Sequence, residues 1–188
     1  QRYLLKMERE MLRRPAGPIV VAISNYVVDQ LRRHYGLPDD RIRLIYNGVD
    51  PDPSTPAQRR RNRKALRGEF GIAATECLVI QVAHNFRLKG VRRWMEALAL
   101  LVKSGMENVR SLIIGKGESQ VWHRLATKLG IAEHLAFVGP SDRVSAFYHA
   151  ADVLVHPTYY DPCSRVVLEA MSAGLPCMGS YGVPHAGD

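Results

Sequence analysis

Residues 77–115 read CLVIQVAHNFRLKGVRRWMEALALLVKSGMENVRSLIIG. The segment opens and closes with short apolar runs, 77–83 and 109–115, which have the length and composition of buried strands. Between them, residues 91–102 place one set of apolar side chains on a single side of a helix: Val91, Trp94, Met95, Leu98, Leu101 and Val102. A strand, a helix and a strand in this order predict a parallel βαβ unit.

The same alternation continues along the chain. Further strands are predicted at 135–139, 152–157 and 176–180. Helices are predicted at 118–129, at 141–150 with Ser141 as the N-cap, and at 164–173. The pattern predicts an α/β protein with a Rossmann-like, doubly wound parallel sheet. Ligands bind at the carboxyl ends of the strands in such sheets, which directs attention to the loops after residues 83, 115, 139 and 157.

The first third of the chain has its own elements. We expect a basic amphipathic helix over 2–14, a strand over 18–24, a helix between Ser24 and Gly36, and a strand over 41–48. The stretch VDPDPSTP (49–56) has the composition of a linker, and RRRNRKALR (59–67) then opens a helix. The domain boundary is therefore predicted within residues 50–67.

The net charge of +8 is unevenly placed. Residues 1–67 contain 15 Lys and Arg against 7 Asp and Glu, whereas residues 68–188 contain 11 of each. Such a surface favours anionic partners, although a solvated basic face without a partner is an equal alternative. The helix over 2–14 could lie on a membrane or pack on the protein's own core. Nucleic-acid binding through 59–67 is disfavoured because this run has no aromatic residue.

Several classes of protein and site are disfavoured by composition. No apolar run reaches the ~18 residues that span a bilayer. The cysteines, Cys77, Cys163 and Cys177, are odd in number and form no CxxC pair, so the sequence predicts neither a disulfide framework nor a zinc site. The acidic pair in Asp50-Pro51-Asp52 lies among prolines, which argues against a metal site there. No metal site is predicted.

Two strand-to-helix loops have residues suited to an anionic ligand. AHNFRLKGV (83–91) carries Arg87 and Lys89, which suit a diphosphate but are also ordinary in a solvated loop. In IIGKGES (113–119), Gly115 and Gly117 let a ligand approach the backbone closely. A tight turn is an equally good explanation for these glycines.

The third loop lies in HPTYYDPCSRVVLEAMSAGLP (156–176). The helix expected near Ser164 would leave unpaired amide groups at its start, those of Ser164, Arg165 and Val166. Glu169 would point back toward these amides and could accept hydrogen bonds from a diol, while Asp161 could meet the other end of an elongated ligand. The alternative is an acid that favours the helix dipole and a surface glutamate. Cys163 has no evident base beside it, so it suits packing or hydrogen bonding better than nucleophilic attack.

Four motifs occur together and in order: NGVD (47–50), RLKG (87–90), GKG (115–117) and HPTYYDPCSRVVLEAMSAGLP. In this combination the chain resembles the retaining glycosyltransferases of family 4, which have the GT-B fold. Within that family it is most similar to the lipopolysaccharide-core glucosyltransferase I type. The resemblance covers nearly the whole chain, and the last motif is its most specific part.

The resemblance implies two Rossmann-like domains with a cleft between them. Residues 1–50 would be the carboxyl-terminal end of the acceptor domain, 51–67 a linker with its entry helix, and 68–188 a truncated nucleotide-sugar domain. The chain would then be a fragment that is inactive by itself.

The resemblance also implies roles for single residues. Arg87 and Lys89 would hold the diphosphate and Glu169 the ribose. Asp161 would contact the donor sugar, where most of the family has a glutamate. The remaining donor-binding residues would be Gly115, Gly117, Val138, Cys163, Ser164, Arg165 and Val166, with Val138 near the base.

The implied activity is retaining transfer of a hexose, glucose in this type, from a UDP-sugar to a hydroxyl group. The acceptor would be a glycolipid or polysaccharide precursor such as lipopolysaccharide core, and no cofactor or metal would be required. The protein would be cytoplasmic, with peripheral contact to the inner membrane face. The alternatives are a non-catalytic nucleotide-sugar-binding module or nucleic-acid binding.

Overall fold

The computed structural model describes residues 2–117 and 120–180, which form two compact units. The first unit runs up to Gly48 and also includes Asp161–Arg165. The second begins at Val49 and comprises Val49–Tyr160 and the described residues from Val166 onward.

The first unit is a small α/β assembly. Its elements are α1 (Arg2–Arg13), β1 (Val20–Ala22), α2 (Asn25–Tyr35), a 3-10 helix η1 (Asp39–Arg41) and β2 (Ile42–Leu44). β1 and β2 pair in parallel. The predicted limits of α2 are confirmed, because Ser24 Oγ accepts a hydrogen bond from the Val27 amide at 3.3 Å and Gly36 ends the helix with a φ of 63°. The strand predicted to extend to residue 48 ends at Leu44.

α1 exposes most of its apolar stripe. Leu4, Met7 and Met11 are 67%, 50% and 48% exposed, whereas Leu12 is buried in the core of the unit. Packing on this unit's own core therefore does not account for the stripe. Within residues 2–117 and 120–180, no helix is both long and apolar enough to cross a bilayer.

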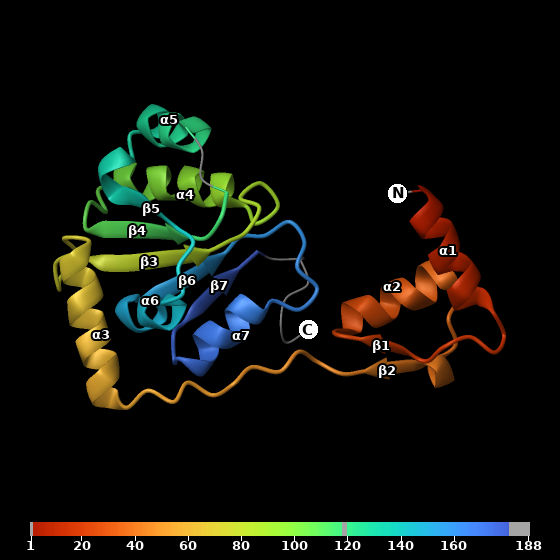
Figure 1. Ribbon diagram of the computed structural model, residues 1–188. Coiled ribbons are helices and arrows are strands. Elements are labelled where there is room, and N and C mark those ends of the chain that lie inside the picture. The colour runs from red at the N-terminus through yellow and green to blue at the C-terminus, as the bar shows by residue number, and fades with distance from the viewer. Residues whose placement is uncertain (1, 118–119, 181–188) are drawn as a thin grey trace. The chain divides into compact units, whose positions relative to one another are not determined.

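The second unit is a doubly wound sheet, as predicted. Its elements are α3 (Pro56–Glu69), β3 (Cys77–Val82), α4 (Val91–Lys103), β4 (Val109–Ile114), α5 (Gln120–Leu129), the 3-10 helix η2 (Ala132–His134), β5 (Leu135–Gly139), α6 (Val144–Ala150), β6 (Val153–His156), α7 (Arg165–Ser172) and β7 (Cys177–Gly179). The strand order is β5-β4-β3-β6-β7, and every pair is parallel. α4 and α5 cover one face of the sheet, and α6 and α7 cover the other (Figure 1).

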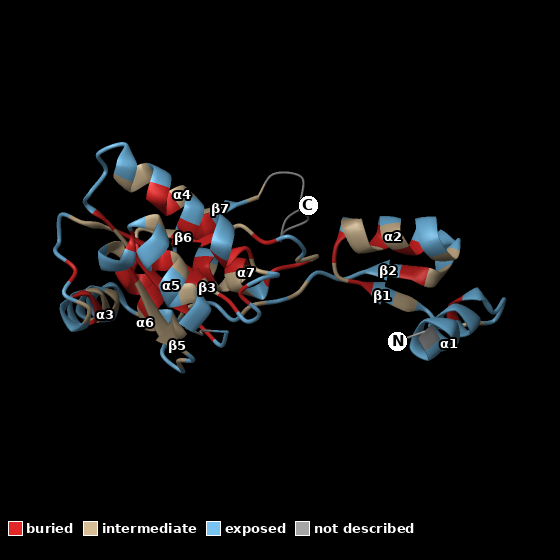
Figure 2. Cartoon of the chain, turned by 90° about the horizontal axis from the view of Figure 1, so that it is seen from above, coloured by how far each residue is buried: buried red, intermediate tan, exposed pale blue. Residues whose placement is uncertain are grey.

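Buried positions concentrate where these helices meet the sheet (Figure 2). Ile80 in β3 and Met95 and Leu98 in α4 have no exposed surface. The apolar side of α4 that the sequence predicts is thus the side that packs on the sheet, and its burial supplies much of the driving force for this layer.

Two predicted helix starts are wrong. α3 begins before residue 59 because Thr55 and Gln58 form a capping box, with the Gln58 amide donating to Thr55 Oγ1 at 3.2 Å. Ser141 does not cap α6. Its hydroxyl oxygen accepts a hydrogen bond from the Arg143 amide at 3.1 Å in the preceding turn, and α6 starts at Val144.

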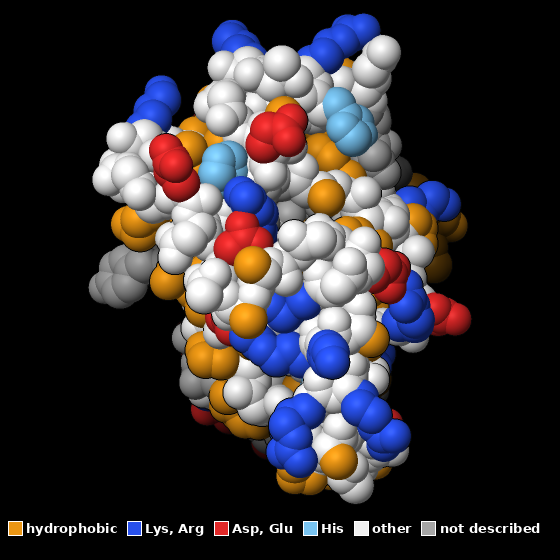
Figure 3. Space-filling view, turned by 90° about the vertical axis from the view of Figure 1, so that its left-hand side faces the viewer, with side chains coloured by type: hydrophobic (Ala, Val, Ile, Leu, Met, Phe, Trp, Pro, Cys, Tyr) orange, Lys and Arg blue, Asp and Glu red, His pale blue; other side chains and the backbone are white. Residues whose placement is uncertain are grey.

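The basic run in α3 divides into two faces. Its inward face carries arginines four residues apart that form ion pairs within the second unit: Arg59 with Asp52, and Arg63 and Arg67 with Asp152. Its outward face carries the exposed cations Arg60, Arg61 and Lys64. Figure 3 shows the side of the molecule on which α3 lies, and many Lys and Arg side chains gather in the lower half of this view. Half of the run therefore holds the fold together rather than facing a partner.

Acid should weaken the second unit through Asp152. Burial acts to raise the pKa of this carboxyl, but hydrogen bonds from the Leu78 amide and Arg63 outweigh it and lower the pKa below its usual range. Because the folded-state pKa is depressed, the stabilisation is present above the unfolded pKa of about 3.9 and is lost as the pH falls through the folded value. We expect Asp152→Asn to cost about 1–3 kcal/mol at neutral pH, and this difference to shrink on acidification.

Urea denaturation between neutral and acid pH measures this effect. The exposed Asp142→Asn is the control and should follow the unsubstituted protein at every pH. A constant difference between Asp152→Asn and the unsubstituted protein down to the acid limit would contradict the assignment.

Candidate functional site

The order of the strands places a topological switch point between β3 and β6. These neighbours lie at the centre of the sheet, and the chain proceeds from β3 to β4 and β5 on one side and from β6 to β7 on the other. Doubly wound sheets bind ligands at such a switch point, outside the carboxyl ends of the strands. The loops after β3 and β6 are those that carry RLKG and the start of HPTYYDPCS.

The two loops are bonded to each other. The carbonyl oxygen of Leu88 accepts hydrogen bonds from the Tyr159 amide at 3.0 Å and from Thr158 Oγ1 at 3.2 Å. Gly90 has a φ of 68°, and a Cβ atom there would collide with the carbonyl oxygen of Pro157. The loop therefore needs glycine at this position, because it passes close to the chain after β6.

Lys89 is fixed through its backbone. Gln81, fully buried in β3, donates a hydrogen bond from Nε2 to the Lys89 carbonyl at 2.7 Å. The Lys89 amide donates to the carbonyl of Asn85 at 3.0 Å, and Asn85 has a positive φ of 56°. Sequence reasoning missed Gln81, although an amide inside a Val- and Ile-rich strand is the kind of residue that needs a buried partner.

Arg87 and Gly117 share a cavity of 620 Å³. Its other lining residues are Asn85, Phe86, Arg92, Val121, Trp122, Leu125 and Tyr159. Tyr159 also lies under the guanidinium of Arg93, which is 3.8 Å from the ring centroid. Cationic and aromatic groups together suit a ligand with an anionic part and a flat apolar part.

The glycines of GKG are required by the protein's own packing. Gly115 has a φ of 126° and lies against the carbonyl of Ala83, and Gly117 has a φ of 154° and lies against the ring of Phe86. These contacts favour the tight-turn interpretation of both glycines, because a side chain at either position would strike a neighbouring segment.

Glu169 is half-buried on α7 and bonded to α6. Tyr148 Oη donates a hydrogen bond to Glu169 Oε2 at 3.1 Å. Burial of the phenol, followed by the charge and hydrogen bond of Glu169, raises the pKa of Tyr148 above its usual range, so the hydroxyl keeps its proton. Val166 is half-buried on the same helix.

The remaining candidates lie in other surroundings. Val138 lines a second cavity, of 660 Å³, with Glu69, Phe70 and Arg143 among its neighbours. In the first unit, Asp161 is half-buried, Arg165 is exposed, and Cys163 and Ser164 are buried. The carbonyl of Cys163 accepts a hydrogen bond from Asn47 Nδ2 at 3.0 Å, and both residues belong to this unit.

The structure thus brings Arg87 and Gly117 into one cavity and holds Lys89 in the same loop, while Glu169 is held separately by Tyr148. The lining of the 620 Å³ cavity includes neither Lys89 nor Glu169. Across the described part of the chain, no group of three or more His, Cys, Asp or Glu side chains is arranged to hold a metal ion.

Comparison with known proteins gives consistent matches over both units. Residues 62–186 match the family described as glycosyl transferases group 1, and residues 1–53 match glycosyltransferase family 4. The chain is 30% identical over 177 residues to the lipopolysaccharide glucosyltransferase WaaG of Escherichia coli K12, which covers 94% of this chain and 47% of WaaG.

Solved structures agree. The crystal structure of WaaG, a glycosyltransferase involved in lipopolysaccharide biosynthesis, superposes with a TM-score of 0.85 at 29% identity over 96% of this chain and 49% of WaaG. Anabaena Alr3699/HepE in complex with UDP-glucose superposes with a TM-score of 0.82 at 21% identity, over 100% of this chain and 55% of HepE. The chain spans about half the length of each of these two proteins, WaaG and HepE.

Proposed function

Because this chain belongs to the glycosyl transferases group 1 family and has the GT-B fold, we propose that the protein of which it forms part transfers a hexosyl group with retention from a nucleoside diphosphate sugar to a hydroxyl group. The observation that carries the proposal is the RLKG loop at the switch point of the sheet. Gln81 and Thr158 hold that loop, so Arg87 and Lys89 follow a rigid backbone at the place where such sheets bind ligands.

The chemistry of this site is electrostatic. The two cations would stabilise the charge that develops on the leaving diphosphate, and the first amides of α7, from Ser164 to Val166, would bind its oxygens. These groups already supply positive charge, so the proposal requires no metal ion or other cofactor. A diphosphate oxygen would take the proton of the acceptor hydroxyl, and no protein nucleophile is needed.

The carboxylates would bind the two ends of the donor. Glu169 would accept hydrogen bonds from the ribose, with Tyr148 holding its other oxygen. Asp161 would contact the sugar. Cys163 and Val138 would complete the donor site, Val138 beside the base. Gly115 and Gly117 would shape the turn at its edge.

We expect Asp161→Ala to lower the rate of transfer by about 10- to 100-fold, the loss typical of a charge-assisted hydrogen bond. Asp161→Glu should retain transfer within a few-fold, because it restores the family's residue and adds one methylene of reach. Steady-state transfer by the complete protein measures both variants. Equal losses in the two variants would contradict a sugar contact at this position.

Glucose and uridine are the donor components we propose. WaaG is a glucosyltransferase, and the fold neighbour HepE holds UDP-glucose. Calorimetric titration of the complete protein with UDP-glucose, UDP-galactose and GDP-mannose tests this choice. The anomeric configuration of the product, read by NMR, tests retention. Binding without any transfer would instead favour a nucleotide-sugar-binding module.

The acceptor we propose is a glycolipid or polysaccharide precursor such as lipopolysaccharide core. The positive surplus in residues 1–67 and the exposed apolar stripe of α1 both suit an anionic, membrane-borne acceptor reached from the cytoplasmic face. Nucleic-acid binding is the weaker alternative, because Arg59, Arg63 and Arg67 already have carboxylate partners.

A further inference from the structure

Asp52 is a buried carboxylate at the start of the second unit. Its side chain is 8% exposed, and its oxygens lie 2.7 Å from His149 Nε2 and 2.9 Å from a guanidinium nitrogen of Arg59. The Ser54 amide donates a further hydrogen bond at 3.0 Å. On the far side of the imidazole, Asn62 Nδ2 lies 3.0 Å from His149 Nδ1. The segment predicted to be a linker is therefore bonded firmly to α3 and α6.

Burial acts to raise the pKa of Asp52, but the hydrogen bonds from His149 and Ser54 outweigh this and lower the pKa below its usual range. The carboxylate is ionised at neutral pH and keeps all of its partners. Removal of any one partner would leave this buried charge incompletely paired, which costs free energy.

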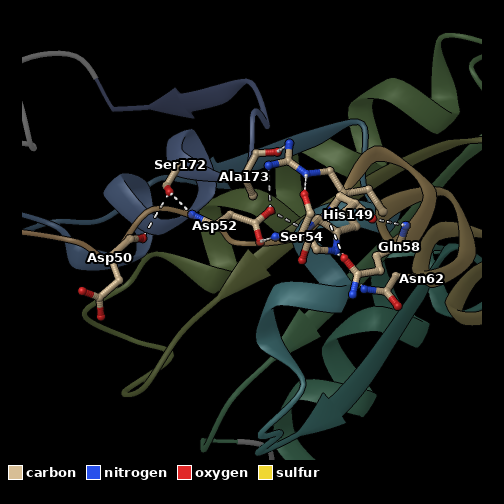
Figure 4. A network of polar contacts seen from close by, with 10 residues as sticks. Asp50, Asp52, Ser54, Gln58, Asn62, His149, Ser172 and Ala173 are labelled. Carbon is tan, nitrogen blue, oxygen red and sulfur yellow. Dashed lines mark hydrogen bonds and ion pairs between the residues drawn. The ribbon is translucent and has the colours of Figure 1, made fainter.

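The segment that carries Asp52 also holds the carboxyl end of α7 (Figure 4). Ser172 Oγ accepts a hydrogen bond from the Asp52 amide at 2.9 Å and donates one to the Asp50 carbonyl at 3.2 Å. Arg59 donates to the carbonyl of Ala173, just beyond the helix, at 3.0 Å. Arg59 therefore joins the Asp52 carboxylate to the end of α7.

Two connections lead from this cluster to Glu169. Through α6, His149 is bonded to Asp52, and the preceding residue, Tyr148, donates to the Glu169 carboxylate at 3.1 Å. Along α7, the Ala173 amide donates to the Glu169 carbonyl at 3.1 Å. The side chain and the backbone of Glu169 are thus both tied to the segment around Asp52.

We propose that residues 50–59 form a clamp that positions Glu169 by fixing the carboxyl end of α7, and that Asp52 and Ser172 are positioning residues of the donor site. The inference rests on the proposed role of Glu169 in binding the donor. α7 has only eight residues, so its placement depends on what holds its ends. A displacement of about 1 Å in a binding group can cost ~10²-fold in rate.

The first test is the affinity of the complete protein for UDP-glucose, measured by calorimetry. Ser172→Ala should weaken binding about fivefold, the factor expected when one hydrogen bond that orders a site is lost. The variant removes a single hydroxyl group and leaves the ion pairs of Asp52 in place, so it keeps the fold. Asp52→Asn, which preserves the shape of the side chain, should weaken binding in the same direction. Met171→Ala, at an exposed position of α7, is the matched control and should bind as the unsubstituted protein does.

A double-mutant cycle separates positioning from a general loss of stability. If Ser172 acts through Glu169, then Ser172→Ala should have no further effect on affinity in a Glu169→Ala background. Additive losses, or an unchanged affinity of Ser172→Ala alone, would overturn the clamp while leaving the donor site intact. An unchanged affinity of Glu169→Ala would overturn the proposed role of Glu169, and the clamp with it.

Discussion

Replacing Arg67 by methionine should lower the free energy of unfolding by about 3–5 kcal/mol, the cost of breaking a buried ion pair from one side. The Arg67 side chain is 6% exposed, and its guanidinium spans the space between α3, the loop after it and α6. It donates to the carbonyl oxygens of Ala150, Ala73 and Glu76, at 3.2 Å and 2.7 Å for the first two. It also pairs with Asp152 at 3.2 Å.

Methionine keeps the apolar stem of Arg67 and removes the donors, so the buried carbonyl oxygens lose this partner. Asp152 then keeps Arg63 as its ion-pair partner and the hydrogen bond from the Leu78 amide. Urea denaturation at neutral pH measures the loss. Arg61→Met, in the same helix but exposed, should change stability by no more than about 0.5 kcal/mol. A loss below about 1 kcal/mol for Arg67→Met would mean that other groups or water satisfy the carbonyls.

Arg67 also shows where sequence reasoning stops. The spacing of Arg59, Arg63 and Arg67 places them on one side of a helix, which is visible in the sequence. Their partners are not, because Asp52 lies before α3 while Asp152 follows α6, 85 residues from Arg67. The net charge counts every cation of residues 59–67 equally. In the structure, the cations on one face of α3 form ion pairs with carboxylates, and those on the other face are exposed.

The strands and helices of the sheet layers were predictable because their signals are local in the sequence. The strand expected at 77–83 is Cys77–Val82, and the helix expected at 91–102 is Val91–Lys103. Each shows a local pattern, a continuous apolar run or one apolar side, that burial in the α/β layers requires. Ser141 does not cap α6, because its hydroxyl oxygen accepts a hydrogen bond from the Arg143 amide in the preceding turn. Serine is favoured in such turns as well as at helix N-caps, so the residue type alone could not distinguish the two.

The site was only partly predictable. Arg87 and Lys89 could be placed in a loop at the carboxyl end of a strand from local pattern alone. The residues that hold this loop and the neighbouring helix, Thr158 and Tyr148, act on segments 70 and 21 positions away in the chain. Such contacts follow from strand order, and strand order is a property of the whole sheet.

Lys89→Ala should reduce transfer by the complete protein by about 10²- to 10³-fold in kcat/KM, the loss typical of removing one preorganised group that stabilises developing charge. Its backbone is held by Gln81 and Asn85, so the loop does not have to be ordered when the side chain binds a phosphate. Arg87 is exposed, and the buried Gln81 side chain binds the backbone of Lys89 and not that of Arg87. We therefore expect Arg87→Ala to lower kcat/KM less than Lys89→Ala does.

Steady-state kinetics with UDP-glucose and acceptor measure these variants, with Lys103→Ala at the exposed end of α4 as the control for loss of a positive charge. Lys103→Ala should leave kcat/KM unchanged. If Lys89 stabilises the leaving diphosphate, the loss should appear mainly in kcat, because the negative charge increases as the bond to the sugar breaks. An effect confined to KM would instead show that Lys89 binds the donor without favouring its cleavage. An unchanged kcat/KM would remove the RLKG loop from the site.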